Sequence, residues 1–137
     1  MKLPKKIIDA NVILRFFLGD DEEKFLKAKV FIQKVEFGEE EILLGELVFA
    51  EVIWVLDKVY KIPRKEIVDK LSKFISYKGV KTILTKDIFL ESLKLYAVHS
   101  IDIQDIFLFV LSKTEDSFVI TFDKTDFKKL NGNFSEP

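Results

Sequence analysis

The chain has 137 residues, which suits one folded domain, and 48% of them are hydrophobic, including 14 phenylalanines, so it can build a packed core. It has no cysteine and a formal net charge of −1, which excludes disulfides, thiolate zinc sites and a generally basic nucleic-acid binder. No apolar run is long enough to span a membrane, and the first residues turn polar too soon for a secretory signal, so we expect a cytoplasmic protein.

Hydrophobic periodicity divides the chain into alternating strands and helices. In chain order we expect a strand at 5–9, helices at 11–18 and 21–36, a strand at 41–44, helices at 46–60 and 63–76, a strand at 80–84, helices at 86–97 and 102–113, a strand at 117–122 and a short helix at 124–130. This order predicts an α/β fold, in which a mainly parallel central sheet is flanked by helices. We expect a single domain over residues 1–130 and a flexible tail over 131–137.

Local signals mark several helix ends. Gly19 closes the first helix, and Asp20 is a suitable N-cap for the next, with Glu23 as its capping partner. Pro63 suits the first turn of the helix that follows it, and Gly79 ends that helix.

Two predicted strands end in aspartate. Asp9 follows Ile7 and Ile8, and Asp123 follows the run Val119–Phe122. In open α/β sheets, ligands bind beyond the carboxyl ends of the strands, so these positions resemble a site. The alternative is that each aspartate only caps the next helix or starts a turn.

Glu51 is the only polar residue in the apolar run Leu47–Leu56, which predicts a buried helix. A buried carboxylate needs compensation by a basic partner, by a proton or by a metal ion. Asp105 opens another apolar helix, three residues after Asp102. We assign the capping role to Asp102, which leaves Asp105 to point toward the sheet edge.

A set of carboxylates without cysteine, and with only one histidine, favours Mg²⁺ or Mn²⁺ over zinc. Such an ion suits phosphodiester hydrolysis. Asn11 and Arg15 lie one helical turn apart just after Asp9. Arg15 is therefore either a phosphate clamp or a solvated helix charge.

At this point the motifs resemble the PIN-domain family, especially its VapC-type toxin ribonucleases. The matching segments are Asp9–Arg15, the helix around Glu51, Asp102–Ile106 and Thr121–Phe127, in this order along nearly the whole chain. The resemblance implies a metal-dependent endoribonuclease that cleaves RNA, forms a homodimer and is held inactive by a cognate antitoxin. It also implies that Asp9, Glu51 and Asp105 are the core ligands of Mg²⁺ or Mn²⁺, with Asp123 as the fourth acid.

The chain departs from the family pattern at two places. Ala10 replaces the Thr or Ser that is common between the first Asp and Asn, so a hydroxyl near the metal is missing or is supplied by Thr121. Asp126 also matches a position that is often acidic. We favour Asp123 as the fourth acid because it directly ends the predicted strand.

Other functions remain open on the sequence. A haloacid-dehalogenase-type phosphatase needs a second Asp where Asn11 stands, and a serine hydrolase would have to use His99 without a Gly-x-Ser-x-Gly elbow. The main rival is a catalytically inactive PIN-like binding module, and another is an RNA-processing nuclease that is not a toxin. The presence of a neighbouring antitoxin gene would distinguish a toxin from the latter.

Overall fold

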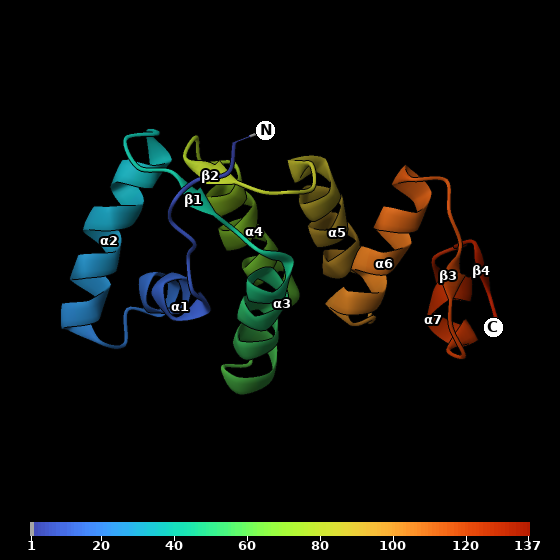
Figure 1. The fold of residues 1–137 in the computed structure, drawn as a ribbon. Helices are drawn as coiled ribbons and strands as arrows, with labels where there is room; N and C mark the ends of the chain where they lie inside the picture. Colours follow the sequence, from blue (N-terminus) through green and yellow to red (C-terminus); the bar gives the residue numbers. More distant parts are fainter. Residues whose placement is uncertain (1) are drawn as a thin grey trace. The chain divides into compact units, whose positions relative to one another are not determined.

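The computed structural model describes residues 2–137 and divides into two compact units (Figure 1). Unit 1 extends to Lys86, and unit 2 comprises Asp87–Pro137. Unit 1 contains α1 (Ala10–Leu18), α2 (Glu22–Glu36), β1 (Ile42–Leu43), α3 (Glu46–Trp54), the π-helical turn η1 (Val55–Val59), α4 (Arg64–Ile75) and β2 (Val80–Lys81). The next helix, α5 (Lys86–Val98), begins at the last residue of unit 1. It is followed in unit 2 by α6 (Ile103–Thr114), β3 (Val119–Ile120), α7 (Lys124–Lys129) and β4 (Phe134–Ser135).

The helices of the structure follow the predicted ones closely, because their caps and apolar faces are strong signals. Gly19 ends α1 in the left-handed conformation (φ 62°), and its N–H bonds the carbonyl of Arg15. On α2, Ala28, Ile32 and Val35 are buried and form its inner face.

Asp20 is not the N-cap of α2. Asp21 holds that position, and its carboxylate accepts a hydrogen bond from the backbone N–H of Lys24 at 3.1 Å. The physical reason is that Asp20 has a closer partner, because its carboxylate lies 2.6 Å from the guanidinium of Arg15.

The predicted helix over 46–60 is present, but its last turn is π-helical. It runs as α3 to Trp54 and then as η1 to Val59. The predicted helix after it begins one residue later than Pro63, whose carbonyl accepts hydrogen bonds from Glu66 and Ile67. Gly79 does not end this helix, because α4 already ends at Ile75 with Ser76 as its C-cap, and Gly79 is buried in the segment that follows. A Cβ there would lie 2.1 Å from the carbonyl oxygen of Glu40, so no larger residue fits without a backbone shift.

The described residues do not form the large central sheet that the sequence predicts. In unit 1, β1 pairs in parallel with β2, and residue Ile7 forms a single parallel bridge with Leu43. In unit 2, β3 pairs in parallel with β4. The strands are short because turns and helices begin within a few residues of the strand ends. Gly45, for example, starts α3 two residues after the end of β1.

Two expectations about chain segments change accordingly. The predicted strand 5–9 is reduced to the bridge at Ile7, supported by a hydrogen bond from the N–H of Ile8 to the carbonyl of Leu43. Within the segment expected to be a flexible tail, Phe134 and Ser135 form β4 and pair with Val119 and Ile120. Over residues 2–137, no helix combines the length and the apolar character needed to cross a membrane.

Candidate metal centre

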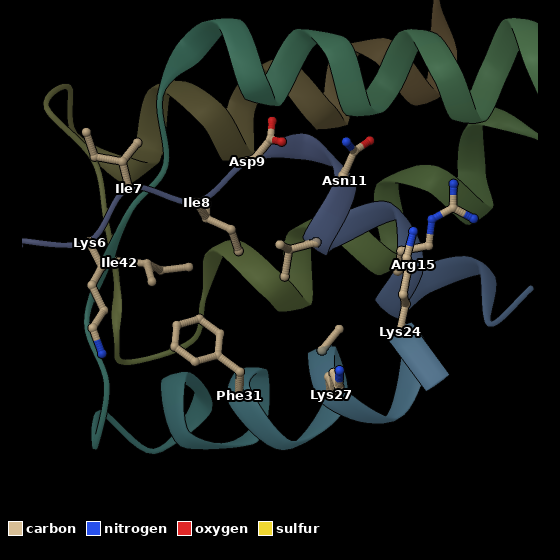
Figure 2. A pocket seen from close by; sticks show the side chains of 12 residues that line it. Lys6, Ile7, Ile8, Asp9, Asn11, Arg15, Lys24, Lys27, Phe31 and Ile42 are labelled. Atoms are coloured by element: carbon tan, nitrogen blue, oxygen red, sulfur yellow. The ribbon is translucent and has the colours of Figure 1, made fainter. Parts of the chain in front are cut away.

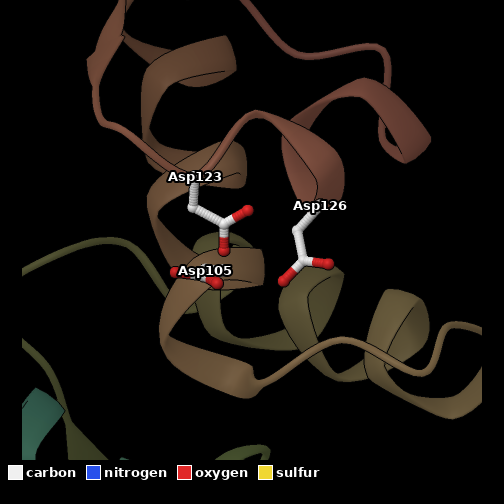
Figure 3. Close-up of side chains that lie close together, drawn as sticks. All are labelled: Asp105, Asp123 and Asp126. Atoms are coloured by element: carbon white, nitrogen blue, oxygen red, sulfur yellow. The ribbon is translucent and has the colours of Figure 1, made fainter. Parts of the chain in front are cut away.

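Three aspartates come together in unit 2. Asp105 lies in the first turn of α6, Asp123 is the N-cap of α7, and Asp126 lies in the first turn of α7. One carboxylate oxygen of each lies within 4.8 Å of the others. Figure 3 shows the three side chains pointing toward one another. Two helix starts therefore deliver three carboxylates to one place, where the positive ends of the helix dipoles favour negative charge.

Local hydrogen bonds hold the chain at this point. The hydroxyl oxygen of Thr121 accepts a hydrogen bond from the backbone N–H of Asp123 at 2.9 Å, which fixes the turn between β3 and α7. Thr121 thus supports the backbone of one of the three acids. Asp102 is the N-cap of α6, as the sequence predicts, although its side chain makes no capping hydrogen bond.

The surroundings of Asp105 destabilise its negative charge. Burial raises the pKa of Asp105, and a hydrogen bond with Asp126 and the charges of Asp126, Asp123 and Asp102 raise it further. Asp105 and Asp126 are half-buried, whereas Asp123 is exposed. The surroundings of Asp105 therefore favour either a proton on its carboxylate or a bound cation beside it.

Asp9 lies in unit 1 and is exposed. It is the N-cap of α1, and its carboxylate accepts a hydrogen bond from the N–H of Ala10 at 2.8 Å. Asp9 and Asn11 both line a pocket of about 640 Å³ in unit 1. Figure 2 shows the apolar side chains of Ile8, Ile42 and Phe31 inside this pocket. The remaining lining residues include the cations Lys6, Arg15, Lys24 and Lys27.

Glu51 is exposed in the structure, and the expectation that it is buried is wrong. The apolar run misled the prediction because one face of α3 is open. Leu47 is 88% exposed and Trp54 is 53% exposed, four residues before and three residues after Glu51. The carboxylate of Glu51 is therefore open to solvent.

Arg15 is paired with Asp20. The hydrogen bond and charge of Asp20 raise the pKa of Arg15, and the hydrogen bond from Arg15 lowers the pKa of Asp20. The hydroxyl of Tyr60 donates a second, longer hydrogen bond to Asp20 at 3.4 Å. Arg15 thus lines the pocket beside Asp9 and Asn11, but its guanidinium already has an anionic partner.

A comparison with protein-family models identifies the chain. The model of the PIN domain matches residues 6–133. The chain belongs to the PIN-domain family. No curated protein is significantly similar to it. PIN domains are usually nucleases and typically bind divalent metal ions.

The acid cluster of this PIN domain fits such an ion chemically. Three carboxylates offer hard oxygen ligands, which Mg²⁺ and Mn²⁺ prefer. A bound cation would also remove the mutual repulsion that raises the pKa of Asp105. Asp105, Asp123 and Asp126 are therefore the residues that could hold a metal ion in unit 2.

Sequence reasoning ranked Asp126 behind Asp123, whereas the structure places both beside Asp105. The signal for Asp126 was its distance of three residues from an N-cap, which puts it on the first turn of α7. The partnership of Asp20 with Arg15 was missed. Gly19 reverses the chain between them, and that turn is what makes the ion pair possible.

Proposed function

We propose that this PIN domain is a Mg²⁺- or Mn²⁺-dependent endoribonuclease. The observation that carries the proposal is the convergence of Asp105, Asp123 and Asp126 within 4.8 Å in a chain of a nuclease family. A divalent cation held there would activate water and neutralise charge on a phosphoryl group. The role of the three carboxylates is to bind that cation.

Asp9 and Glu51 belong to the same proposal through the family motifs. Both are exposed carboxylates, open to a ligand from solvent. We propose that they take part in the same reaction as the acid cluster. Asn11 lies beside Asp9 on α1 and is proposed to support it.

The test is cleavage of a fluorescently labelled single-stranded RNA with Mg²⁺ or Mn²⁺. We expect EDTA to abolish cleavage. We expect Asp105→Asn to lower the rate by at least about 100-fold, as when a group that acts on the transition state is lost. Asp9→Asn and Glu51→Gln should each lose most of the rate while the protein stays folded by circular dichroism.

Asp102→Asn is the matched control, because it removes the same charge from the same helix start and asparagine caps helices well. Its rate should stay within a few-fold of the unmodified protein. Full activity in EDTA, or an unaffected Asp105→Asn variant, would refute the proposed mechanism.

We also propose that the protein acts as the toxin of a toxin–antitoxin pair, is a homodimer and binds a small cognate antitoxin. Exposed Leu26 and Val30 lie one turn apart on α2 and offer an apolar face to a second copy. The pocket beside Asp9 offers an apolar floor to a partner protein. Light scattering that shows a monomer at high concentration would contradict the dimer, and a genome neighbourhood without a small partner gene would count against the antitoxin.

A further inference from the structure

The segment from the end of η1 to the start of α4 carries the densest positive charge in the sequence. Residues 58–65 hold four cations and no acid, a combination that no other eight-residue stretch of the chain reaches. The four are Lys58, Lys61, Arg64 and Lys65. Lys58, Lys61 and Lys65 are exposed, and Arg64 is partly exposed.

Two acids flank this run, Asp57 before it and Glu66 after it. The carboxylate of Asp57 lies 3.8 Å from the ammonium of Lys58 and 3.9 Å from the guanidinium of Arg64. These distances are at the long limit for ion pairs, and one carboxylate is shared between two cations. With both flanking acids counted, residues 57–66 keep a net charge of +2.

Two exposed aromatic rings accompany the cations. Trp54, the only tryptophan, is 53% exposed four residues before Lys58, and Tyr60 is 41% exposed within the run. The hydroxyl of Tyr60 donates to Asp20, which also binds Arg15, so this ring is tied to the start of α2. We call the set Trp54, Lys58, Tyr60, Lys61, Arg64 and Lys65 the basic–aromatic surface.

The charge balance of the two units shows why an RNA-cleaving enzyme needs such a surface. Residues 87–137, which contain the acid cluster, have five Lys and Arg against nine Asp and Glu, a net charge of −4. Residues 1–86 have 17 against 14, a net charge of +3. The acids cannot attract a phosphate backbone by themselves, so affinity has to come from cations elsewhere.

We propose that the basic–aromatic surface binds single-stranded RNA. Exposed aromatic rings stack on unpaired bases of any sequence, and lysines beside them contact the phosphates, which is how sequence-tolerant single-strand binding works. Trp54 and Tyr60 supply the rings, and Lys58, Lys61 and Lys65 supply the phosphate contacts. The choice of RNA as the ligand rests on the proposed nuclease function.

The experiment measures the binding of a fluorescein-labelled 15-nucleotide oligouridine by anisotropy, in EDTA so that no cleavage occurs. We expect Lys61→Gln/Lys65→Gln to weaken binding by about tenfold at 50 mM KCl. It should also reduce the slope of log K against log[KCl] by about 1.4, since each phosphate contact on a single strand contributes about 0.7. The matched control is Lys34→Gln/Lys73→Gln, which removes two exposed charges from unit 1 outside this surface. It should change binding less than twofold.

Stacking is tested separately at Trp54. We expect Trp54→Ala to weaken binding by roughly tenfold without changing the salt slope, and Trp54→Phe to retain most of the affinity, because phenylalanine still stacks. A duplex of the same length should bind more weakly than the single strand, since its bases are already paired. An equal loss in the lysine control, no loss at Trp54, or a preference for duplex would overturn the proposal.

The outcome is separable from that of the proposed function. If the unmodified protein binds oligouridine through this surface but never cleaves RNA with Mg²⁺ or Mn²⁺, the nuclease proposal fails and this inference stands. If the protein cleaves RNA but the surface variants bind oligouridine as well as the unmodified protein does, the nuclease proposal stands and this inference fails. If Trp54→Ala instead converts a dimer to a monomer in light scattering and leaves RNA binding intact, the surface is a protein interface and the inference is wrong.

Discussion

At Asp105, burial, hydrogen bonding and neighbouring charge all favour the protonated carboxyl. Folding therefore raises its pKa above the ordinary value of 3.8. A group of this kind stabilises the fold fully at pH values below its unfolded pKa, and the contribution is lost as the pH rises through the raised folded pKa. In the metal-free protein, Asp105 thus favours folding in acid and opposes it at neutral pH.

This gives a prediction for the difference in the free energy of unfolding between the unmodified protein and Asp105→Asn. With EDTA present, the free energy of unfolding of the variant should increase relative to that of the unmodified protein as the pH rises from about 3.5 to 7. Urea denaturation at several pH values measures it, and solvent screening keeps the effect modest because Asp105 is only half-buried. A difference that is constant over this range, or that moves in favour of the unmodified protein, would contradict the assignment.

The same residues show how far a sequence can predict a site. Asp105 was identified from its position at the start of an apolar helix, and Asp123 from its position at the end of a predicted strand. Both positions depend on local signals that survive into the structure. The burial of Glu51 was predicted from the apolar character of its neighbours alone. Apolar composition does not say which side of a helix is covered, and here the side with Leu47 and Trp54 is open.

At the scale of elements, helices were easier to predict than strands. A helix is specified by its own residues, through periodicity and capping, so α1 to α7 lie close to the predicted ranges. A strand exists only through its partner, and the partner is not encoded nearby. The predicted strand 5–9 became one bridge, whereas Phe134–Ser135 paired with β3 without any strong strand signal of its own.

The start of α2 gives a prediction at this scale, because two adjacent aspartates have different roles there. Asp21→Ala removes the side-chain hydrogen bond to the N–H of Lys24, so it should lower the free energy of unfolding by about 1 kcal/mol. Asp20→Ala removes an exposed ion pair with Arg15, which typically contributes less. Urea denaturation of both variants checks the order. A larger loss for Asp20→Ala would restore Asp20 as the cap.

At the scale of the whole molecule, the family assignment and the acid cluster carry different information. The match over residues 6–133 covers segments of both units, so the chain as a whole is a PIN domain. The cluster of Asp105, Asp123 and Asp126 is a group of carboxylates in unit 2 that could hold a cation. Neither observation depends on the other. Their agreement favours a metal-dependent nuclease over an inactive binding module, because a binding module has no need of three carboxylates placed so close together.

The response of the whole fold to a cation follows from that repulsion and needs no substrate. An ion that binds only the folded state stabilises it by RT ln(1 + [L]/Kd), about 1.4 kcal/mol at tenfold above Kd. For a chain of this size, Mg²⁺ or Mn²⁺ should therefore raise the melting temperature by roughly 3–6 °C. Asp105→Asn should raise the metal-free melting temperature, because it relieves repulsion from Asp123 and Asp126, and should shrink the response to the ion.

Calorimetry or a dye-based melt measures both effects, with NaCl at matched ionic strength to account for general screening. Asp69→Asn, an exposed aspartate on α4, removes the same charge outside the cluster and should keep the full response to the ion. A structural role for the cluster makes the opposite prediction, since deleting one member of a stabilising network destabilises the fold. If Asp105→Asn melts below the unmodified protein and keeps the same divalent response, the carboxylates serve the fold and the metal centre is refuted.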